Sequence, residues 1–215
     1  MSVVEVVIID YGAGNLLSVK RAVEFCGAKV KVSSNFEEIT TAKKVILPGV
    51  GAFRDAMESL RKLCLIEAIH ELKVLNTPLL GICLGMQLMM DESDEFGITS
   101  GLGLIPGRVI SIPDKATNGQ RLKIPNVGWR ELMPIGSQDQ WGCSPLKNNQ
   151  LGESVYFVHS FMVSPADPDV IIADCKYGGH KIPAVIKKHQ IVGCQFHPEK
   201  SGRAGLKLIE SFIRS

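Results

Sequence analysis

The chain reads Leu-Leu-Gly-Ile-Cys-Leu-Gly-Met-Gln-Leu-Met-Met from residue 79 to residue 90, and this stretch holds the strongest structural signal in the sequence. An apolar run ends in a Gly-x-Cys-x-Gly motif, and residues that favour helix follow at once. This order predicts a strand, a sharp turn at Cys83 and a helix. Gly81 and Gly85 leave room for the turn and for close packing of the helix.

Cys83 stands at the predicted N-terminus of that helix. The helix dipole and the free backbone N–H groups there favour the thiolate form of a cysteine. The amide of Leu84 is placed to donate to an oxyanion formed when Cys83 attacks a carbonyl. The same pattern fits a buried cysteine in a strand-to-helix turn, because free cysteine is among the most buried residue types. The stretch alone leaves both alternatives open.

The composition predicts one globular domain that spans residues 1–215. Of the 215 residues, 45% are hydrophobic and 21% are charged, and no apolar run approaches the ~20 residues of a membrane span. The formal net charge of +2 is too small to indicate binding to nucleic acid, and no Lys/Arg cluster is interleaved with aromatic residues. We therefore expect neither a membrane nor a nucleic acid partner.

The six cysteines form no Cys-x-x-Cys pair and no regular framework. This usage indicates a reducing compartment. Residues 1–10 lack the basic segment and the cleavage site of a signal peptide. Both features predict a cytoplasmic protein.

Strand and helix patterns alternate through the first part of the chain. Strands are predicted at Val3–Ile9, Ala28–Val32, Lys44–Leu47 and Leu79–Ile82, and helices at Leu16–Phe25, Phe36–Ala42 and Arg54–Leu75. The alternation predicts an α/β fold with a doubly wound, mostly parallel sheet and helices on both faces. Sites in such sheets lie beyond the carboxyl ends of the strands, where Asp10, residues 48–51 and Cys83 would gather.

Short strands and turns follow residue 97 and predict a small antiparallel extension. Short strands are predicted at Val109–Ile112, Leu122–Pro125, Val155–Val158 and Val170–Ala173, and two later hydrophobic strands at Ala184–Ile186 and Ile191–Phe196. A polar insertion between Met133 and Gly152 is predicted to be a surface loop. The final segment, Ala204–Ile213, is an amphipathic helix that we expect to pack on the sheet.

Two glycine-rich loops follow predicted strands. Residues 10–15 read Asp-Tyr-Gly-Ala-Gly-Asn, which lacks the third glycine of a dinucleotide-binding loop and fits a turn that opens a helix. Residues 48–51 read Pro-Gly-Val-Gly, without the Lys-Ser/Thr of a phosphate loop. Because glycine lets backbone N–H groups approach a ligand closely, Val50 or Gly51 is a candidate second oxyanion donor. The alternative is an ordinary turn between a strand and a helix.

A thiol nucleophile needs a base, and the base needs an orienting acid. His197 follows a hydrophobic strand and precedes Pro198 and Glu199, so a histidine and a carboxylate leave one strand end two residues apart. A histidine after a strand is often structural, but His-Pro-Glu supplies both missing roles. The other histidines lie in a helix, a turn, a glycine loop and at the end of an aromatic strand, at His70, His189, His180 and His159. Of these, only the last is expected to line a site.

Three motifs together resemble the class I, triad-type glutamine amidotransferases. They are Gly-Ile-Cys-Leu-Gly-Met-Gln at 81–87, Pro-Gly-Val-Gly at 48–51 and Gln-Phe-His-Pro-Glu-Lys-Ser at 195–201. More narrowly, residues 10–15 and Tyr-Phe-Val-His-Ser at 156–160 are similar to the glutaminase subunits of imidazole glycerol phosphate synthases. The resemblance extends over nearly the whole chain.

The resemblance implies a role for each matching residue. The family's nucleophile falls on Cys83, its base on His197 and its orienting acid on Glu199. Its oxyanion hole maps to the backbone of Val50, Gly51 and Leu84, and its glutamine pocket maps to Gln87, Glu95, Ser160 and Phe161. No metal or organic cofactor is implied.

The reaction implied by the resemblance is hydrolysis of glutamine. The thiolate attacks the γ-carboxamide, ammonia leaves after His197 donates a proton, and water hydrolyses the γ-glutamyl thioester. The ammonia would pass to a synthase or cyclase subunit in a heterodimer. That subunit makes imidazole glycerol phosphate and an aminoimidazole carboxamide ribotide in histidine biosynthesis.

Three alternatives remain open from the sequence. Asn126 stands in Pro-Asn-Val-Gly-Trp where the family usually has histidine, and close paralogues supply ammonia to sugar-modifying amidotransferases of surface-polysaccharide pathways. A cysteine peptidase or deglycase shares the elbow but would not need Gln87 and Glu95. An inactive scaffold of the same fold would not need an intact triad.

Overall fold

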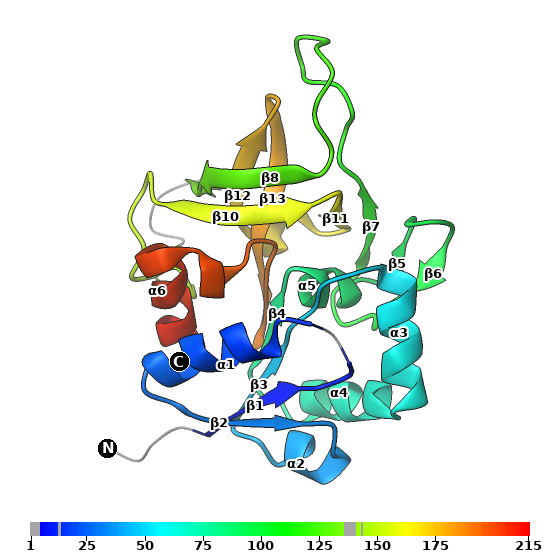
Figure 1. The fold of residues 1–215 in the computed structure, drawn as a ribbon, viewed down its shortest axis with the longest axis vertical. Coiled ribbons are helices and arrows are strands. Elements are labelled where there is room, and N and C mark those ends of the chain that lie inside the picture. The colour runs from blue at the N-terminus through cyan, green and yellow to red at the C-terminus, as the bar shows by residue number, and fades with distance from the viewer. Residues whose placement is uncertain (1–4, 13, 136–140, 143) are drawn as a thin grey trace.

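The computed structural model describes residues 5–12, 14–135, 141–142 and 144–215 and has an α/β fold around an eight-stranded sheet (Figure 1). From one edge to the other, the strands are β2 (Lys29–Ser33), β1 (Glu5–Ile9), β3 (Lys44–Leu47), β4 (Leu79–Ile82), β14 (Ile191–Cys194), β13 (His180–Lys188), β12 (Ile171–Tyr177) and β9 (Met133–Pro134). The strands from β2 to β14 are parallel, and the remaining pairs are antiparallel. The predicted fold class is confirmed.

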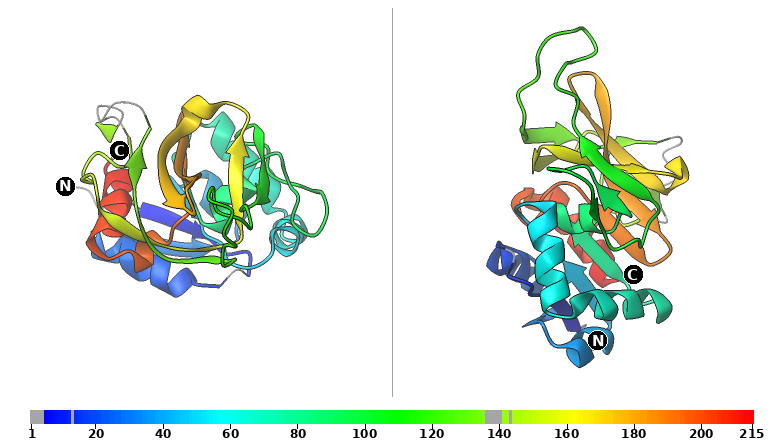
Figure 2. Two further views of the ribbon diagram at one scale, coloured as in Figure 1. Left: turned by 90° about the horizontal axis from the view of Figure 1, so that it is seen from above. Right: turned by 90° about the vertical axis from the view of Figure 1, so that its right-hand side faces the viewer.

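Helices cover both faces of the parallel strands (Figures 1 and 2). One face carries α1 (Leu16–Phe25) and α6 (Gly202–Ile213), and the other carries α2 (Phe36–Thr40), α3 (Phe53–Lys62) and α4 (Leu65–Val74). Successive strand residues point to opposite faces, so Val6 and Ile8 pack in the first layer and Val7 and Ile9 in the second. Coverage on both faces explains why these strands read as continuous apolar runs.

Two smaller sheets form the extension, and one of them pairs β8 (Asn126–Glu131) with β10 (Ser154–His159). The other has the order β11 (Phe161–Pro165), β7 (Gly107–Ser111), β5 (Glu92–Ser93) and β6 (Thr99–Ser100). The described strand pairs of both sheets are antiparallel except β5 with β7. In Figure 1, β8 and β10 lie in the upper part, and β5 and β6 lie lower, beside α3. Because β10 and β11 are consecutive in the chain, residue 160 between them joins the two sheets.

Some local predictions were wrong. The segment Arg54–Leu75 is two helices, because Cys64 takes a left-handed conformation (φ 54°) that ends the helical path. The strand predicted at Leu122–Pro125 begins instead at Asn126, since proline cannot donate a ladder hydrogen bond. His180 begins β13 rather than lying in a loop, and β14 ends at Cys194.

The insertion between Met133 and Gly152 is only partly described. Residues 136–140 and 143 lie outside the described ranges, as do the first two residues of the strand predicted at Val3–Ile9. Within the described part, Trp141 and Leu146 are buried in the core layer of α6. The Nδ2 atom of Asn149 also donates to the carbonyl oxygen of Ala204, at 2.9 Å. The described residues of this part form the predicted loop, but the loop does not lie wholly at the surface, because two apolar side chains anchor it in the core.

The elbow at Cys83 is confirmed. Cys83 joins β4 to α5 (Leu84–Leu88) with φ 53° and ψ −109°, a conformation that non-glycine residues rarely adopt. A Cβ atom on Gly85 would lie 1.8 Å from the carbonyl oxygen of Leu47 in β3. A Cβ atom on Gly81 would lie 2.7 Å from the carbonyl oxygen of Gly85. The helix therefore rests directly on the backbone of the neighbouring strand.

We predict that Gly85→Ala destabilises the protein severely. The added methyl group overlaps a backbone oxygen that cannot rotate away, so α5 and β3 must separate, at an expected cost of ~3 kcal/mol or more. Denaturant unfolding measures this cost. Gly119→Ala is the control, because it meets no atom within 4 Å but has φ +84°, so only backbone strain of ~1 kcal/mol is expected. Equal losses in the two variants would contradict the packing argument.

Candidate active site

A cavity of about 400 Å³ lies beyond the carboxyl ends of β3, β4 and β14. All the site residues predicted from the sequence line it except Glu199, namely Val50, Gly51, Cys83, Leu84, Gln87, Glu95, Ser160, Phe161 and His197. Segments far apart in the chain therefore meet at the edge of the sheet where the fold predicts a site.

His197 and Glu199 form a buried pair behind this cavity. The Nδ1 atom of His197 lies 2.8 Å from Oε1 of Glu199, and the two side chains are 2% and 0% exposed. Pro198 opens a short 3-10 turn, η3 (Pro198–Lys200), that bends the chain between them. The Nδ2 atom of Asn15 donates to the same Glu199 oxygen at 2.5 Å. The carboxylate is thus held from two sides and fixes the plane of the imidazole ring.

Cys83 and Glu199 both raise the pKa of His197. Burial disfavours the charged ring, but the neighbouring Cys83 and Glu199 outweigh burial and raise the pKa of His197 to about 9. The Nε2 atom of His197 makes no hydrogen bond to any residue in the described part of the chain. The raised pKa favours the charged form of His197, whose Nε2 atom then carries a proton.

The loop at residues 48–51 packs directly against the elbow. A Cβ atom on Gly49 would lie 2.5 Å from the Tyr11 hydroxyl oxygen and 3.0 Å from Cβ of Leu84. That hydroxyl donates to the carbonyl oxygen of Pro48 at 2.8 Å. Gly51 has φ +107°, which favours glycine. The hydrogen bond from Tyr11 therefore holds one end of the loop, and Gly51 allows the turn at the other end. The oxyanion role of Val50, Gly51 and Leu84 stays a prediction.

Gln87 and Glu95 present acceptors to the cavity. The Nε2 atom of Gln87 donates to the carbonyl oxygen of Phe161 and to Oε1 of Gln195, both at 3.0 Å. Both amide hydrogens are thus used inside the protein, and the Gln87 oxygen is the atom left for a ligand. Glu95 uses Oε2 to accept from the backbone N–H of Phe53 at 2.6 Å, at the start of α3. Its other oxygen is available to a cation.

His159 also lines the cavity, as its position after an aromatic strand predicts. Its Nδ1 atom lies 2.8 Å from the carbonyl oxygen of Phe161, which can only accept, so Nδ1 carries the proton. Its Nε2 atom accepts from Nδ2 of Asn126 at 3.1 Å. Burial, with the nearby charge of His197 as a smaller cause, lowers the pKa of His159 to about 4. His159 is therefore neutral where His197 is charged.

The sequence predicted no role for two residues that contact members of the predicted triad. Asn15 holds Glu199 from 184 positions away along the chain, and only its place in the Asp-Tyr-Gly-Ala-Gly-Asn motif hinted at a function. Gln195 directs its Nε2 atom to the sulfur of Cys83 at 3.7 Å. It stands in the quoted Gln-Phe-His-Pro-Glu motif, but nothing in the motif says which atom it contacts.

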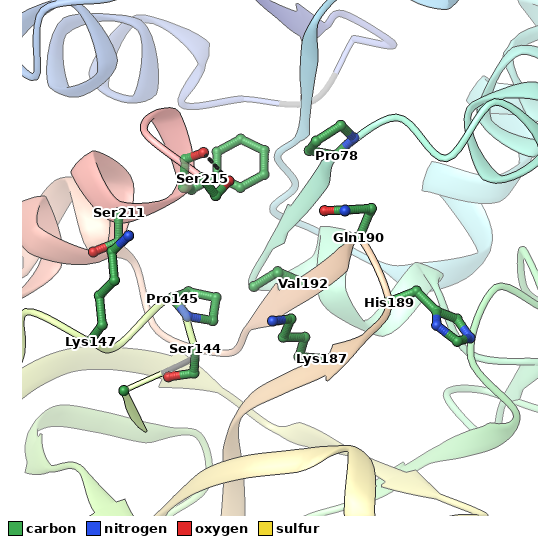
Figure 3. A pocket seen from close by; sticks show the side chains of 12 residues that line it. Pro78, Ser144, Pro145, Lys147, Lys187, His189, Gln190, Val192, Ser211 and Ser215 are labelled. Carbon is green, nitrogen blue, oxygen red and sulfur yellow. Dashed lines mark hydrogen bonds between the residues drawn. The ribbon is translucent and has the colours of Figure 1, made fainter. Parts of the chain in front are cut away.

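A second cavity, of about 160 Å³, lies at the opposite, amino ends of β4 and β14 (Figure 3). Pro78, Lys147, Lys187 and His189 are among the residues that line it. No cysteine is present among its described lining residues, so it lacks the nucleophile of the first cavity. In the ranges that the structure describes, no helix has the length and apolar character needed to cross a bilayer.

Comparisons with known proteins agree with this geometry. The family model for class-I glutamine amidotransferases matches residues 7–215. The imidazole glycerol phosphate synthase subunit HisH 1 of Legionella pneumophila (strain Lens) is 50% identical over 207 residues, which are 96% of this chain and 97% of the relative. The HisH subunit of Geobacillus sp. (strain WCH70) is 46% identical over 205 residues, or 95% of this chain and 94% of the relative.

Solved structures show the same fold at low sequence identity. PurLQS from Thermotoga maritima superposes with a TM-score of 0.73 at 16% identity, covering 99% of both chains. A crystal structure of a glutamine amidotransferase gives a TM-score of 0.71 at 16% identity, covering 97% of this chain and 99% of that chain. These two likenesses concern the fold alone.

We predict that His159 makes the protein less stable in mild acid. Its pKa is about 4 in the folded protein against an ordinary value of 6.5, so the unfolded chain binds more protons between these pH values. The free energy of unfolding should therefore fall by ~2 kcal/mol between pH 7 and pH 5 because of this residue. Urea unfolding of the unmodified protein and His159→Gln at both pH values measures the effect.

The variant should lose that part of the pH dependence. His70→Gln, an exposed position on α4, should retain it. If His159→Gln and the unmodified protein lost equal stability between pH 7 and pH 5, the low pKa of His159 would be wrong.

Proposed function

The chain belongs to the class-I glutamine amidotransferase family, and we propose that it is the glutaminase subunit of an imidazole glycerol phosphate synthase. The observation that carries the proposal is the cavity in which Cys83, on its strained elbow, faces the same space as His197, Gln87 and Glu95. The HisH relatives, 42–50% identical over nearly the whole chain, support the synthase in particular.

The geometry supports a distinct role for each of these residues in the reaction. The Cys83 thiolate attacks the γ-carbonyl carbon of glutamine, and backbone N–H groups of Leu84 and the 48–51 loop stabilise the oxyanion. The Nε2 atom of His197 donates its proton to the departing nitrogen, which leaves as ammonia. His197 then takes a proton from the water that hydrolyses the thioester. Glu199 keeps the ring oriented and favours its charged form throughout.

The two acceptors in the cavity support glutamine as the substrate. The free oxygen of Gln87 can accept a hydrogen bond from the carboxamide NH₂ group, whereas a carboxylate would meet two acceptors with no hydrogen between them. The free oxygen of Glu95 complements the α-amino group. This pair supports selection of glutamine over glutamate, and it disfavours a peptidase or deglycase, whose reactions need neither contact.

Exposed apolar side chains support a docking surface for the partner near the cavity. Ile124 is next to cavity-lining Pro125, and Val127 and Trp129 follow on β8; these side chains are 37%, 47% and 53% exposed. We propose that the synthase subunit covers this surface, so that ammonia leaves the cavity into the complex. Neighbouring exposed apolar side chains are typical of surfaces that bind another protein.

Asn126, which departs from the family's usual histidine, is buried and hydrogen-bonded to His159. It therefore contributes no exposed side chain to the proposed docking surface. This weakens the argument from Asn126 for a sugar-modifying partner, and we keep the histidine-pathway synthase as the proposal. Assays with each kind of partner subunit test the choice.

We predict that Cys83→Ala, assembled with the synthase subunit, loses glutamine-dependent product formation. Synthesis from added ammonium salts should continue, because only the glutaminase step uses the thiolate. Product formation with each nitrogen source measures the two activities separately. Cys64→Ala, at an exposed free cysteine, is the control and should retain both. Normal glutamine turnover by Cys83→Ala would refute the proposed nucleophile.

We predict that His197→Asn slows glutamine hydrolysis about 10³-fold and Glu199→Gln about 10- to 100-fold. Asparagine cannot carry the proton. Glutamine at 199 can still accept from His197 and Asn15 with one oxygen, because the second carboxylate oxygen has no partner among the described residues. Only the charge is lost. The rate of thioester formation is measured for both variants. If Glu199→Gln formed the thioester more slowly than His197→Asn, the assigned roles would be reversed.

A further inference from the structure

Gln195 is a fully buried side chain between the glutamine pocket and the nucleophile. Its Oε1 atom accepts from Nε2 of Gln87 at 3.0 Å, and its own Nε2 atom lies 3.7 Å from Sγ of Cys83, a hydrogen-bonding distance for sulfur. Gln195 is not among the residues that line the cavity. It therefore reaches the sulfur from the protein side, and the substrate approaches from the other.

The direction of this hydrogen-bond chain is fixed by chemistry. The carbonyl oxygen of Phe161 can only accept, so Gln87 must turn its NH₂ group toward it. The second hydrogen of that NH₂ group then points to Gln195, which must accept it with its side-chain oxygen. The NH₂ group of Gln195 is consequently the end that faces Cys83. An inverted amide would place two NH₂ groups against each other at this contact.

The backbone holds both residues in place. The N–H of Gln195 donates to the carbonyl oxygen of Ala184 at 2.9 Å, and the N–H of Cys83 donates to that of Cys194 at 2.7 Å. Gln195 and Cys83 therefore each follow directly the end of one of two adjacent, hydrogen-bonded strands, β14 and β4. No rearrangement is needed for the amide to meet the sulfur, which is the condition for preorganised electrostatic stabilisation.

We propose that Gln195 is a hydrogen-bond donor to the Cys83 thiolate, and that it stabilises the charged sulfur and fixes its position for attack. A donor in a buried site stabilises a charge more strongly than the same donor in water. His197 supplies a positive charge, and Gln195 supplies a directed N–H from another side. The inference rests on the proposed function only in taking Cys83 as the nucleophile.

The test is the pH dependence of Cys83 alkylation by iodoacetamide, followed by mass spectrometry of the peptide that contains Cys83. Gln195→Met keeps the side-chain length and removes the donor, so the midpoint of the pH profile should rise by about one unit. Gln190→Met is the control, because Gln190 is exposed and precedes the same strand; its profile should not move. An unchanged midpoint in Gln195→Met would overturn the proposal.

A second measurement avoids any change at position 195. In the unmodified protein, the side-chain amide resonances of Gln195 should shift with pH at the same midpoint as Cys83 alkylation, and Cys83→Ala should abolish that shift. If the Gln195 resonances shifted neither with pH nor on substitution of Cys83, the proposal would be overturned even if Gln195→Met failed to fold. Alkylation of Cys83 does not use glutamine. The experiment therefore tests the role of Gln195 independently of the proposed glutaminase function, and either hypothesis can fail without the other.

Discussion

The absence of space between Gly85 and the carbonyl oxygen of Leu47 is the constraint on which the site depends. Because a Cβ atom there would lie 1.8 Å from that oxygen, α5 can approach β3 only with glycine at this position. The close approach of α5 to β3 requires a sharp turn between β4 and α5, and Cys83 makes this turn with a positive φ. The strained backbone of Cys83 is therefore the local consequence of placing the start of α5 at the end of the sheet.

Burial of the His197–Glu199 pair imposes a second requirement. A buried carboxylate is expensive unless its oxygens are hydrogen-bonded. One oxygen of Glu199 accepts from both His197 and Asn15. Ser201 donates to the His197 carbonyl oxygen at 2.6 Å and accepts from the N–H of Tyr156, which ties η3 to β10. The position of His197, the proposed base, is thus set by β14, β10 and the loop before α1, and not by its own segment alone.

The bounds of helices and strands were predictable from the sequence where a single hydrophobic pattern dominated. The helix Leu16–Phe25 and the strand Lys44–Leu47 were predicted with their observed bounds, because amphipathic period and continuous burial leave no competing pattern. The break at Cys64 was missed because a cysteine gives no signal for a left-handed backbone. The burial of Trp141 was missed because it depends on tertiary packing. In the site, motifs at strand ends indicated Cys83, His197 and the 48–51 loop, whereas Gln87, Glu95, Ser160 and Phe161 came from the family resemblance alone. The contact between Asn15 and Glu199 was not predictable, because no local pattern encodes a partner 184 residues away.

The two histidines in the cavity show how one fold assigns opposite charge states to one side-chain type. His197 has an acidic partner at Nδ1, whereas His159 has a carbonyl oxygen there and an amide at Nε2. Burial therefore prevails at His159, and the nearby anions prevail at His197. A neutral His159 can join Asn126 on β8 to the Phe161 carbonyl without adding a second positive charge beside the thiolate. Since that carbonyl also receives Gln87, the strand bearing the exposed Trp129 connects to the glutamine pocket through neutral hydrogen bonds alone.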